Sequence, residues 1–280
     1  MIVTLTTDFG HRDGYVAAMK GAMLSVKPDL RMVDVTHDVS AQDVMEAAFV
    51  LRQVVPSFPA ESVHLVVVDP GVGTERRALA ARFAMGGRTH RFVGPDNGVL
   101  PLLAGEFVGE IVELDRAEAW FGPSPSRTFH GRDVFGPVAA RLAAGAQLAD
   151  VGTPVESVSA MHWPLPRIDD QAIDGMVLHV DAFGNCVTNI TAQDLDERRD
   201  GRSFKCYAGS TVIQSHQATY AEVSVGDAVT LIGSSGLLEI AVNCGHAADL
   251  LSIQRGASVN VVFGSPSREA RAGAAVTEAG

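Results

Sequence analysis

The sequence predicts an α/β protein with two domains. An N-terminal three-layer α/β domain with a mostly parallel sheet is followed by a smaller C-terminal antiparallel β-barrel-like domain. Apolar runs alternate with amphipathic stretches through the first half, which is typical of parallel strands covered by helices. After a segment with two prolines, short strands separated by turn signals take over. The length of 280 residues suits one or two domains.

Strands and helices alternate in the first domain. Val63–Asp69 is a β-branched run of the kind that is buried on both faces of a sheet. Helices are expected to stop at Pro28 and before Pro56. The predicted strands are Ile2–Thr7, Arg31–Thr36, Val63–Asp69, Arg91–Val93 and Glu110–Leu114, and the predicted helices are Gly14–Val26, Ala41–Val55 and Val134–Ala144.

The second domain is expected to consist of short strands with one helix near His246–Leu251. Its predicted strands are Gly175–Val180, Asn185–Ile190, Ser203–Tyr207, Ala228–Ile232, Leu237–Val242 and Ser258–Phe263. The predicted organisation is an α/β domain over residues 1–162, a linker over 163–173, a β-barrel domain over 174–264 and a flexible tail over 265–280.

Composition excludes several classes of function. With 22 Lys and Arg against 33 Asp and Glu, the net charge is −11, which argues against nucleic-acid binding and anionic membrane surfaces. No apolar stretch is long enough to span a membrane, and the start of the chain lacks a signal-peptide pattern. Three widely spaced cysteines indicate a reducing, cytoplasmic compartment, and the nine histidines form no metal-binding motif.

Two aspartates follow the carboxyl ends of predicted strands. Asp8 comes after Ile2–Thr7, and Asp69 ends the run Val63–Asp69. In open α/β sheets, ligands bind outside those strand ends, where a carboxylate can accept from ribose hydroxyls or orient a water. Either residue alone can equally be a helix N-cap or a turn residue. The pair indicates a pocket without identifying its ligand.

Two first-domain loops carry further candidates. The segment from Gly71 to Arg76 resembles a dinucleotide-binding loop, but Arg76 stands at the third glycine position, so the signal for NAD is weak. It is either a plain turn or a loop whose backbone approaches a ligand closely. His130 precedes the helix predicted at Val134, where it caps or packs against that helix, or holds and relays a proton.

Two second-domain loops are ambiguous in the same way. Asp181-Ala-Phe183-Gly-Asn185 suits a tight hairpin, but its ring and amide would also suit a purine. The loop from Gly233 to Gly236 is either a β-turn or a site for a carboxylate or phosphate.

Six segments together are similar to the S-adenosylmethionine hydroxide adenosyltransferase family, the relatives of fluorinase and chlorinase. They are TTDFG, VVDPGVGTERR, GPDNGVL, TFHGRDVF, DAFGNCVTNI and IGSSGLLEIAVNCGHAA, in the family's order and spacing. The resemblance covers about residues 1–262. It implies a homotrimer that converts S-adenosylmethionine and water to adenosine and L-methionine, without a cofactor. It also implies a substrate held between the N-terminal domain of one subunit and the C-terminal domain of its neighbour.

The resemblance assigns roles residue by residue. Asp69, Arg76 and His130 match the catalytic Asp-Arg-His set of the hydroxide branch. The positions that match substrate-binding residues are Asp8 for ribose, Asp181 for the methionine ammonium, Phe183, Tyr220 and Asn185 for adenine, Ser234 and Ser235 for the methionine carboxylate, and Asp13 as a further contact.

Five departures separate this chain from the halogenases. Those enzymes have tyrosines at the positions of Asp69 and His130, a halide-contacting serine at Gly131 and an arginine at Ser235. They also carry a long insertion where this chain has only Met85–Thr89 between strands. The resemblance therefore favours hydroxide over halide. A chlorinase-type halogenase and a non-catalytic S-adenosylmethionine or nucleoside sensor remain the alternatives.

The implied chemistry needs an activated water. The sulfonium is already a good leaving group, so the weak nucleophile limits the reaction, and Asp69 can accept its proton. Arg76 is always charged and cannot be the base, and His130 can orient the water or pass the proton on. An arginine beside Asp69 is expected to lower the pKa of that carboxyl.

Overall fold

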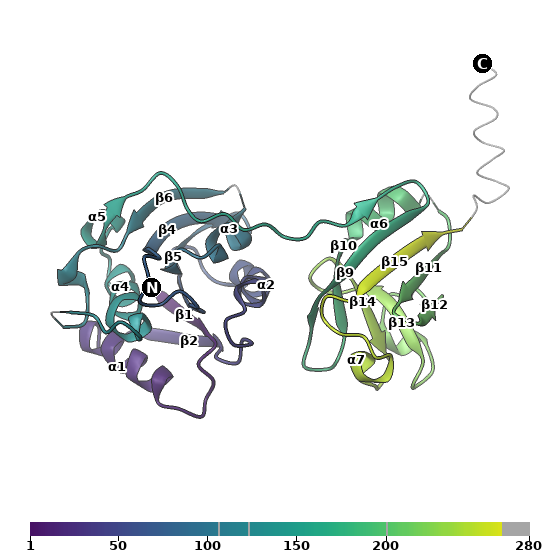
Figure 1. Ribbon diagram of the computed structural model, residues 1–280, viewed down its shortest axis with the longest axis horizontal. Coiled ribbons are helices and arrows are strands. Elements are labelled where there is room, and N and C mark those ends of the chain that lie inside the picture. Colours follow the sequence, from purple (N-terminus) through teal and green to yellow (C-terminus); the bar gives the residue numbers. More distant parts are fainter. Residues whose placement is uncertain (106, 123, 200, 265–280) are drawn as a thin grey trace, which may run out of the picture. The chain divides into compact units, whose positions relative to one another are not determined.

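The computed structural model describes residues 1–105, 107–122, 124–199 and 201–264 (Figure 1). It divides into two compact units, Met1–Trp163 and Pro164–Gly280. The tail predicted over 265–280 lies outside the described residues. Each unit has its own apolar core.

A seven-stranded sheet in the order β2-β1-β3-β5-β4-β6-β7 forms the centre of the first unit. Strands β2, β1, β3, β5 and β6 run in one direction, whereas β4 and β7 run against them, so the predicted mostly parallel sheet is confirmed. The strands are β1 Ile2–Thr7, β2 Arg31–Thr36, β3 Val63–Val67, β4 Ala78–Met85, β5 Arg88–Pro95, β6 Val108–Glu113 and β7 Thr153–Pro154.

Helices cover both faces of this sheet and complete three layers. The core on one face joins α1 (Tyr15–Val26) and α4 (Gly136–Ala143) to β1 and β3. The core on the other face joins α2 (Val44–Val54) and α3 (Val99–Ala104) to side chains such as Val66. Every residue of β3 is buried, as its apolar run predicted. Shorter elements are α5 Leu148–Val151, 3₁₀ turns at Val55–Ser57 and Ala117–Ala119, and a π-helical turn at Gly131–Phe135.

The second unit is an antiparallel sheet of eight strands that curls toward a barrel. The main path runs β12-β11-β15-β9-β10-β14-β13, and β8 pairs with β9. A bridge from His216, just after β12, to Thr230 on β13 brings the two edges together, as the predicted barrel-like domain requires. The elements are β8 Arg167–Ile168, β9 Ala172–Val180, β10 Cys186–Thr191, α6 Ala192–Arg199, β11 Phe204–Ala208, β12 Thr211–Ile213, a 3₁₀ turn Tyr220–Glu222, β13 Ala228–Ile232, β14 Leu237–Val242, α7 Ala247–Leu250 and β15 Ser258–Phe263.

Several elements have no counterpart among the predictions. Helix α6 buries only Leu195, so its sequence carries no apolar stripe. Helix α3 is a short, almost uniformly apolar run, in which helical and strand periodicity look alike. Strand β8 lies inside the segment predicted as a linker and pairs with β9.

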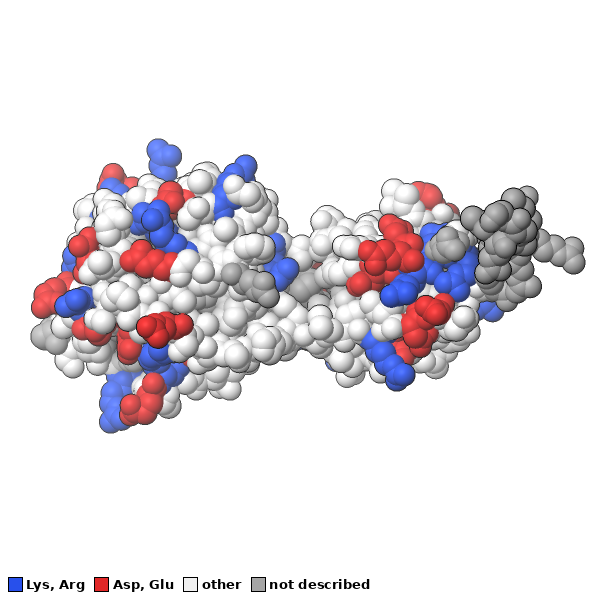
Figure 2. Space-filling view, turned by 90° about the horizontal axis from the view of Figure 1, so that it is seen from above, with Lys and Arg blue, Asp and Glu red and all other residues white. Residues whose placement is uncertain are grey.

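No helix among the described residues is long and apolar enough to cross a bilayer. On the face shown in Figure 2, acidic and basic side chains are interspersed on both units.

Three buried polar side chains on neighbouring strands of the first unit's sheet, β1, β3 and β5, are linked by hydrogen bonds. The Thr4 hydroxyl lies 2.8 Å from His64 Nδ1, and His64 Nε2 lies 3.1 Å from His90 Nδ1. His64 is fully buried. Burial, reinforced by the nearby His90, lowers the pKa of His64 to about 3. The folded protein therefore keeps this histidine neutral at a pH where the unfolded chain protonates it.

Because the folded pKa is lowered, stability is lost as pH falls below the unfolded value of about 6.5. As the pH falls from 7 to 5, we expect the titration of His64 to lower the free energy of unfolding by about 2 kcal/mol. Denaturant unfolding of His64→Gln should show a correspondingly shallower pH dependence than the unmodified protein. The exposed His162→Gln serves as the control, with an unchanged slope. Equal slopes in His64→Gln and the unmodified protein would contradict this assignment.

Candidate functional site

A pocket of about 220 Å³ lies at the carboxyl ends of β1 and β3. Asp8 directly follows β1, and Asp69 follows β3. The loop that precedes α4 contributes Thr128, Phe129, His130 and Gly131 to the same pocket. The structure thus brings together the two aspartates and the histidine that the sequence singled out, at the edge of the sheet where α/β proteins bind ligands.

Asp69, Arg76 and His130 form one hydrogen-bonded cluster. Arg76 Nε donates to Asp69 Oδ1 at 3.0 Å and Nη2 donates to Oδ2 at 2.5 Å, a two-point ion pair. The same Nη2 lies 3.1 Å from His130 Nδ1. Both ion-pair side chains are at least nine-tenths buried, at 5% exposure for Asp69 and 7% for Arg76. The guanidinium also stacks over the Phe135 ring, 5.3 Å from its centroid.

Arg76 has the expected lowering effect on the pKa of Asp69, but the net shift of that pKa is upward. Burial is the largest influence and raises the pKa of the Asp69 carboxyl, outweighing the opposing effects of the Arg76 charge and hydrogen bonds. The sequence showed the charged neighbour but not the depth of burial. A raised pKa makes Asp69 a better proton acceptor than an exposed aspartate.

His130 is neutral and its proton is on Nε2. Arginine can only donate, so the contact from Arg76 Nη2 requires an unprotonated Nδ1 on His130. Burial and the adjacent Arg76 charge both lower the pKa of His130 in agreement with this assignment. In this arrangement the ring offers a donor at Nε2 and no free acceptor, so within the cluster only Asp69 can take up a proton.

The π-helical turn at Gly131–Phe135 directly follows His130. Such turns are uncommon and often occur at functional sites. Gly131 packs tightly there, since a Cβ atom at this position would lie 3.2 Å from both Phe9 Cζ and Val67 Cγ1. Position 131 is therefore closely packed against apolar atoms.

The remaining first-unit candidates differ in their placement. Asp8 lines the pocket, and its Oδ2 accepts from the backbone N–H of Gln42 at 2.8 Å. Asp13 is exposed in the turn before α1 and does not line that pocket. Gly73 has a positive φ of 77°, and a Cβ there would meet the Arg127 carbonyl at 2.2 Å. Packing within the chain therefore explains this glycine.

A larger pocket of about 850 Å³ gathers most of the second-unit candidates. Phe183 is 78% exposed, so its ring is available for stacking. Asp181, Phe183, Asn185, Tyr220 and Ser234 all line this pocket, whereas Ser235 does not.

The loop joining β9 and β10 is held by its own aspartate. Asp181 Oδ1 accepts from the backbone N–H groups of Phe183 and Asn185, at 2.9 and 2.8 Å. Asp181 Oδ2 accepts from Asn185 Nδ2 at 3.0 Å. Gly184 has a φ of 85°, and a Cβ there would lie 2.2 Å from the His246 ring. These contacts fix the loop in a form that presents Phe183.

Sequence reasoning missed Glu239 and His246, which also line this pocket. Glu239 is 6% exposed, and its Oε1 accepts from the Tyr220 hydroxyl at 2.6 Å. The available signal was a lone carboxylate within the apolar run LLEIAV of β14. His246 caps α7 by accepting from the Asp249 N–H. The sequence gives a weaker indication of this histidine than of Glu239.

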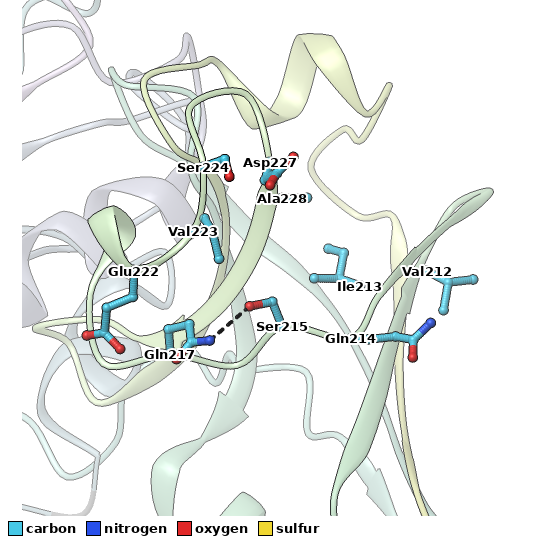
Figure 3. Close-up of a pocket in the computed structure, with 10 residues that line it drawn as sticks. All are labelled: Val212, Ile213, Gln214, Ser215, Gln217, Glu222, Val223, Ser224, Asp227 and Ala228. Atoms are coloured by element: carbon cyan, nitrogen blue, oxygen red, sulfur yellow. Dashed lines mark hydrogen bonds between the residues drawn. The ribbon is translucent and has the colours of Figure 1, made fainter.

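A further pocket of about 580 Å³ in the second unit contains none of the predicted residues (Figure 3). Its lining is mainly polar, and Gln217 Nε2 donates to Ser215 Oγ within it at 3.2 Å. Among the described residues, no group of three or more His, Cys, Asp or Glu side chains is arranged to hold a metal ion.

Comparison with known proteins identifies relatives over nearly the whole chain. A family model described as the SAM hydroxide adenosyltransferase N-terminal domain matches residues 3–152, and the corresponding C-terminal domain model matches residues 175–260. A crystal structure of an uncharacterized conserved protein from Thermotoga maritima matches with a TM-score of 0.87 at 34% identity, covering 93% of this chain and 100% of that one.

Named relatives fall in two groups. The (R)-S-adenosyl-L-methionine hydrolases of Salinispora arenicola and Thermus thermophilus are 43% and 37% identical, covering 94% and 93% of this chain and 98% and 99% of theirs. A fluorinase from Actinoplanes is more distant, at 27% identity over 93% of this chain and 97% of its own. Both domain models and these full-length matches show that the chain belongs to the SAM hydroxide adenosyltransferase family.

Proposed function

We propose that this protein is an enzyme that hydrolyses S-adenosyl-L-methionine to adenosine and L-methionine. The observation that carries the proposal is the buried Asp69–Arg76–His130 cluster in a pocket at the strand ends, in a chain whose close relatives are named S-adenosyl-L-methionine hydrolases. Purified protein incubated with S-adenosyl-L-methionine should yield adenosine and methionine in equal amounts by chromatography. Binding without turnover would indicate the sensor alternative.

The reaction is a substitution at the ribose C5′ carbon. Water attacks C5′, the new C–O bond forms as the C–S bond breaks, and the electron pair of that bond returns to sulfur to give the methionine thioether. Because the sulfonium leaves as a neutral group, the reaction needs neither a cofactor nor an acid on the leaving group. The energetic difficulty lies in the water, whose pKa is about 15.7 in bulk.

The cluster supplies a base and the means to orient the water. Asp69 lines the pocket and accepts the proton of the attacking water, helped by the burial that raises its pKa. Arg76 fixes both Asp69 oxygens and the unprotonated nitrogen of His130. His130 then orients the water through its Nε2–H. Placement of the water in line with the C–S bond supplies much of the rate.

The other predicted residues hold the substrate. Asp8 accepts hydrogen bonds from the ribose hydroxyls beside the attacking water. Asp13 is a more distant contact of the substrate. In the second-unit pocket, Phe183 and Tyr220 pack against adenine, and Asn185 meets its edge. Asp181 contributes negative charge toward the methionine ammonium, and Ser234, with Ser235, binds the carboxylate.

We further propose a cytoplasmic homotrimer. The family resemblance supports a site completed by the first unit of one subunit and the second unit of its neighbour. The three cysteines, Cys186, Cys206 and Cys244, are all free thiols, which supports a reducing compartment.

The base assignment predicts a large loss of turnover. Asp69→Asn keeps the size of the side chain but removes its charge, so kcat should fall by about 10²–10⁴ while substrate affinity changes much less. Asp96→Asn is the matched control, because Asp96 is similarly buried and paired with the neighbouring Arg77 but does not line the pocket. Full turnover by Asp69→Asn, or an equal loss in Asp96→Asn, would contradict the assignment.

The adenine assignment predicts a loss of nucleoside affinity. Phe183→Ala removes a stacking surface worth roughly 1–3 kcal/mol, so calorimetry should show weaker binding of adenosine. The control is Phe107→Ala, since Phe107 has a comparable exposure of 71% but lies in the first unit. If Phe183→Ala binds adenosine as tightly as the unmodified protein, the adenine ring does not stack on Phe183.

The assembly proposal predicts three chains per particle by light scattering at the concentrations used for activity. Neither unit expressed alone should bind substrate tightly, since each carries only part of the proposed contacts. A stable monomer with full activity would rule out a site shared between subunits.

A further inference from the structure

Glu239 occupies an unusual position in the second unit. It lies in the middle of β14, opposite Leu231 on β13 and Val187 on β10. Its neighbours along the strand, Leu238 and Ile240, point into the barrel core and are fully buried. Glu239 therefore faces the other side of the sheet, where it lines the 850 Å³ pocket while remaining 94% buried.

One oxygen of this carboxylate remains available to a ligand. Oε1 accepts from the Tyr220 hydroxyl. For Oε2 the structure shows no hydrogen-bond donor among the described residues, and a Cβ atom placed on Gly233 would lie only 2.6 Å from it. The oxygen therefore lies against the Gly233–Gly236 turn, the same turn that carries Ser234. A carboxylate oxygen without a donor can accept a hydrogen bond from a ligand.

The charges around the pocket are unbalanced. Asp181 and Glu239 both line it, whereas its lining contains neither lysine nor arginine. His246 Nδ1 accepts from the Asp249 N–H at 3.3 Å, so this nitrogen donates to neither carboxylate. Burial is the largest influence and, together with the nearby Asp181, raises the pKa of Glu239 against the lowering effect of the Tyr220 hydrogen bond. A cationic ligand group would relieve both effects.

Asp181 and Glu239 are not equivalent acceptors. Both oxygens of Asp181 already accept hydrogen bonds from its own loop. Its charge contributes to the field in the pocket, but Oε2 of Glu239 is the better placed to accept a new hydrogen bond.

From these contacts we propose that Glu239 is a further substrate-binding residue, whose carboxylate binds the α-ammonium group of the methionine moiety. The inference rests on the proposed function. The α-ammonium and α-carboxylate share one carbon atom, so the residues that bind them must be close neighbours. Ser234, assigned to the carboxylate, directly follows the glycine against which Glu239 Oε2 lies. The adenine amino group is neutral and calls for no buried carboxylate.

The test measures recognition of the ammonium alone. L-Methionine and 4-(methylthio)butanoate, which lacks the ammonium, are titrated by calorimetry into protein saturated with adenosine. The unmodified protein should bind methionine at least 10-fold more tightly than the analogue, as expected for a charge-assisted hydrogen bond. Glu239→Gln should lose about 10-fold in methionine affinity and most of this discrimination. Gly233→Ala, which crowds Oε2, should shift affinity in the same direction.

Adenosine binding checks the fold of each variant in the same samples. Glu239→Gln should bind adenosine within about twofold of the unmodified protein, since Gln retains an acceptor for Tyr220. Glu197→Gln, an exposed glutamate of α6, is the matched control and should leave every affinity unchanged. Undiminished discrimination in Glu239→Gln, or an equal loss for methionine and the analogue, would overturn the inference. Failure of the unmodified protein to bind adenosine would instead overturn the proposed function.

Discussion

The buried ion pair between Asp69 and Arg76 is the interaction on which the proposed site depends. Taking either charge out of water alone would cost several kcal/mol, so each residue requires the other. Arg76 is also tied to His130 and to the Arg77 carbonyl, and it packs on Phe135. One guanidinium thus connects the loop after β3 to the turn before α4, and sets both the orientation of Asp69 and the tautomer of His130.

This arrangement resolves an apparent conflict in the chemistry. A base beside an arginine should be weak, because the positive charge stabilises the carboxylate. Here burial has the larger effect, and the pKa of Asp69 is raised despite Arg76. In the proposed mechanism, the arginine therefore holds Asp69 in position without preventing it from accepting a proton, and His130 donates to the same water.

The sequence predicted the parts of the protein that depend on local pattern. The all-buried β3, the Val134 helix region and strands β13, β14 and β15 appear where apolar runs and turn residues placed them. Helix α6 was missed because it buries a single leucine. Most of the predicted site residues line two pockets, whereas Asp13 and Ser235 do not. The pKa shifts and the buried position of Glu239 depend on burial and on cross-strand neighbours, which no local pattern records.

The central claim is that water assisted by Asp69 attacks the ribose carbon directly. The most direct measurement is turnover of S-adenosyl-L-methionine in ¹⁸O-labelled water, followed by mass spectrometry of the adenosine and methionine formed. Direct attack by water predicts one labelled oxygen in adenosine, at the 5′ position, and none in methionine. Adenosine without the label at that carbon would contradict direct attack by water and, with it, the assignment of Asp69, Arg76 and His130.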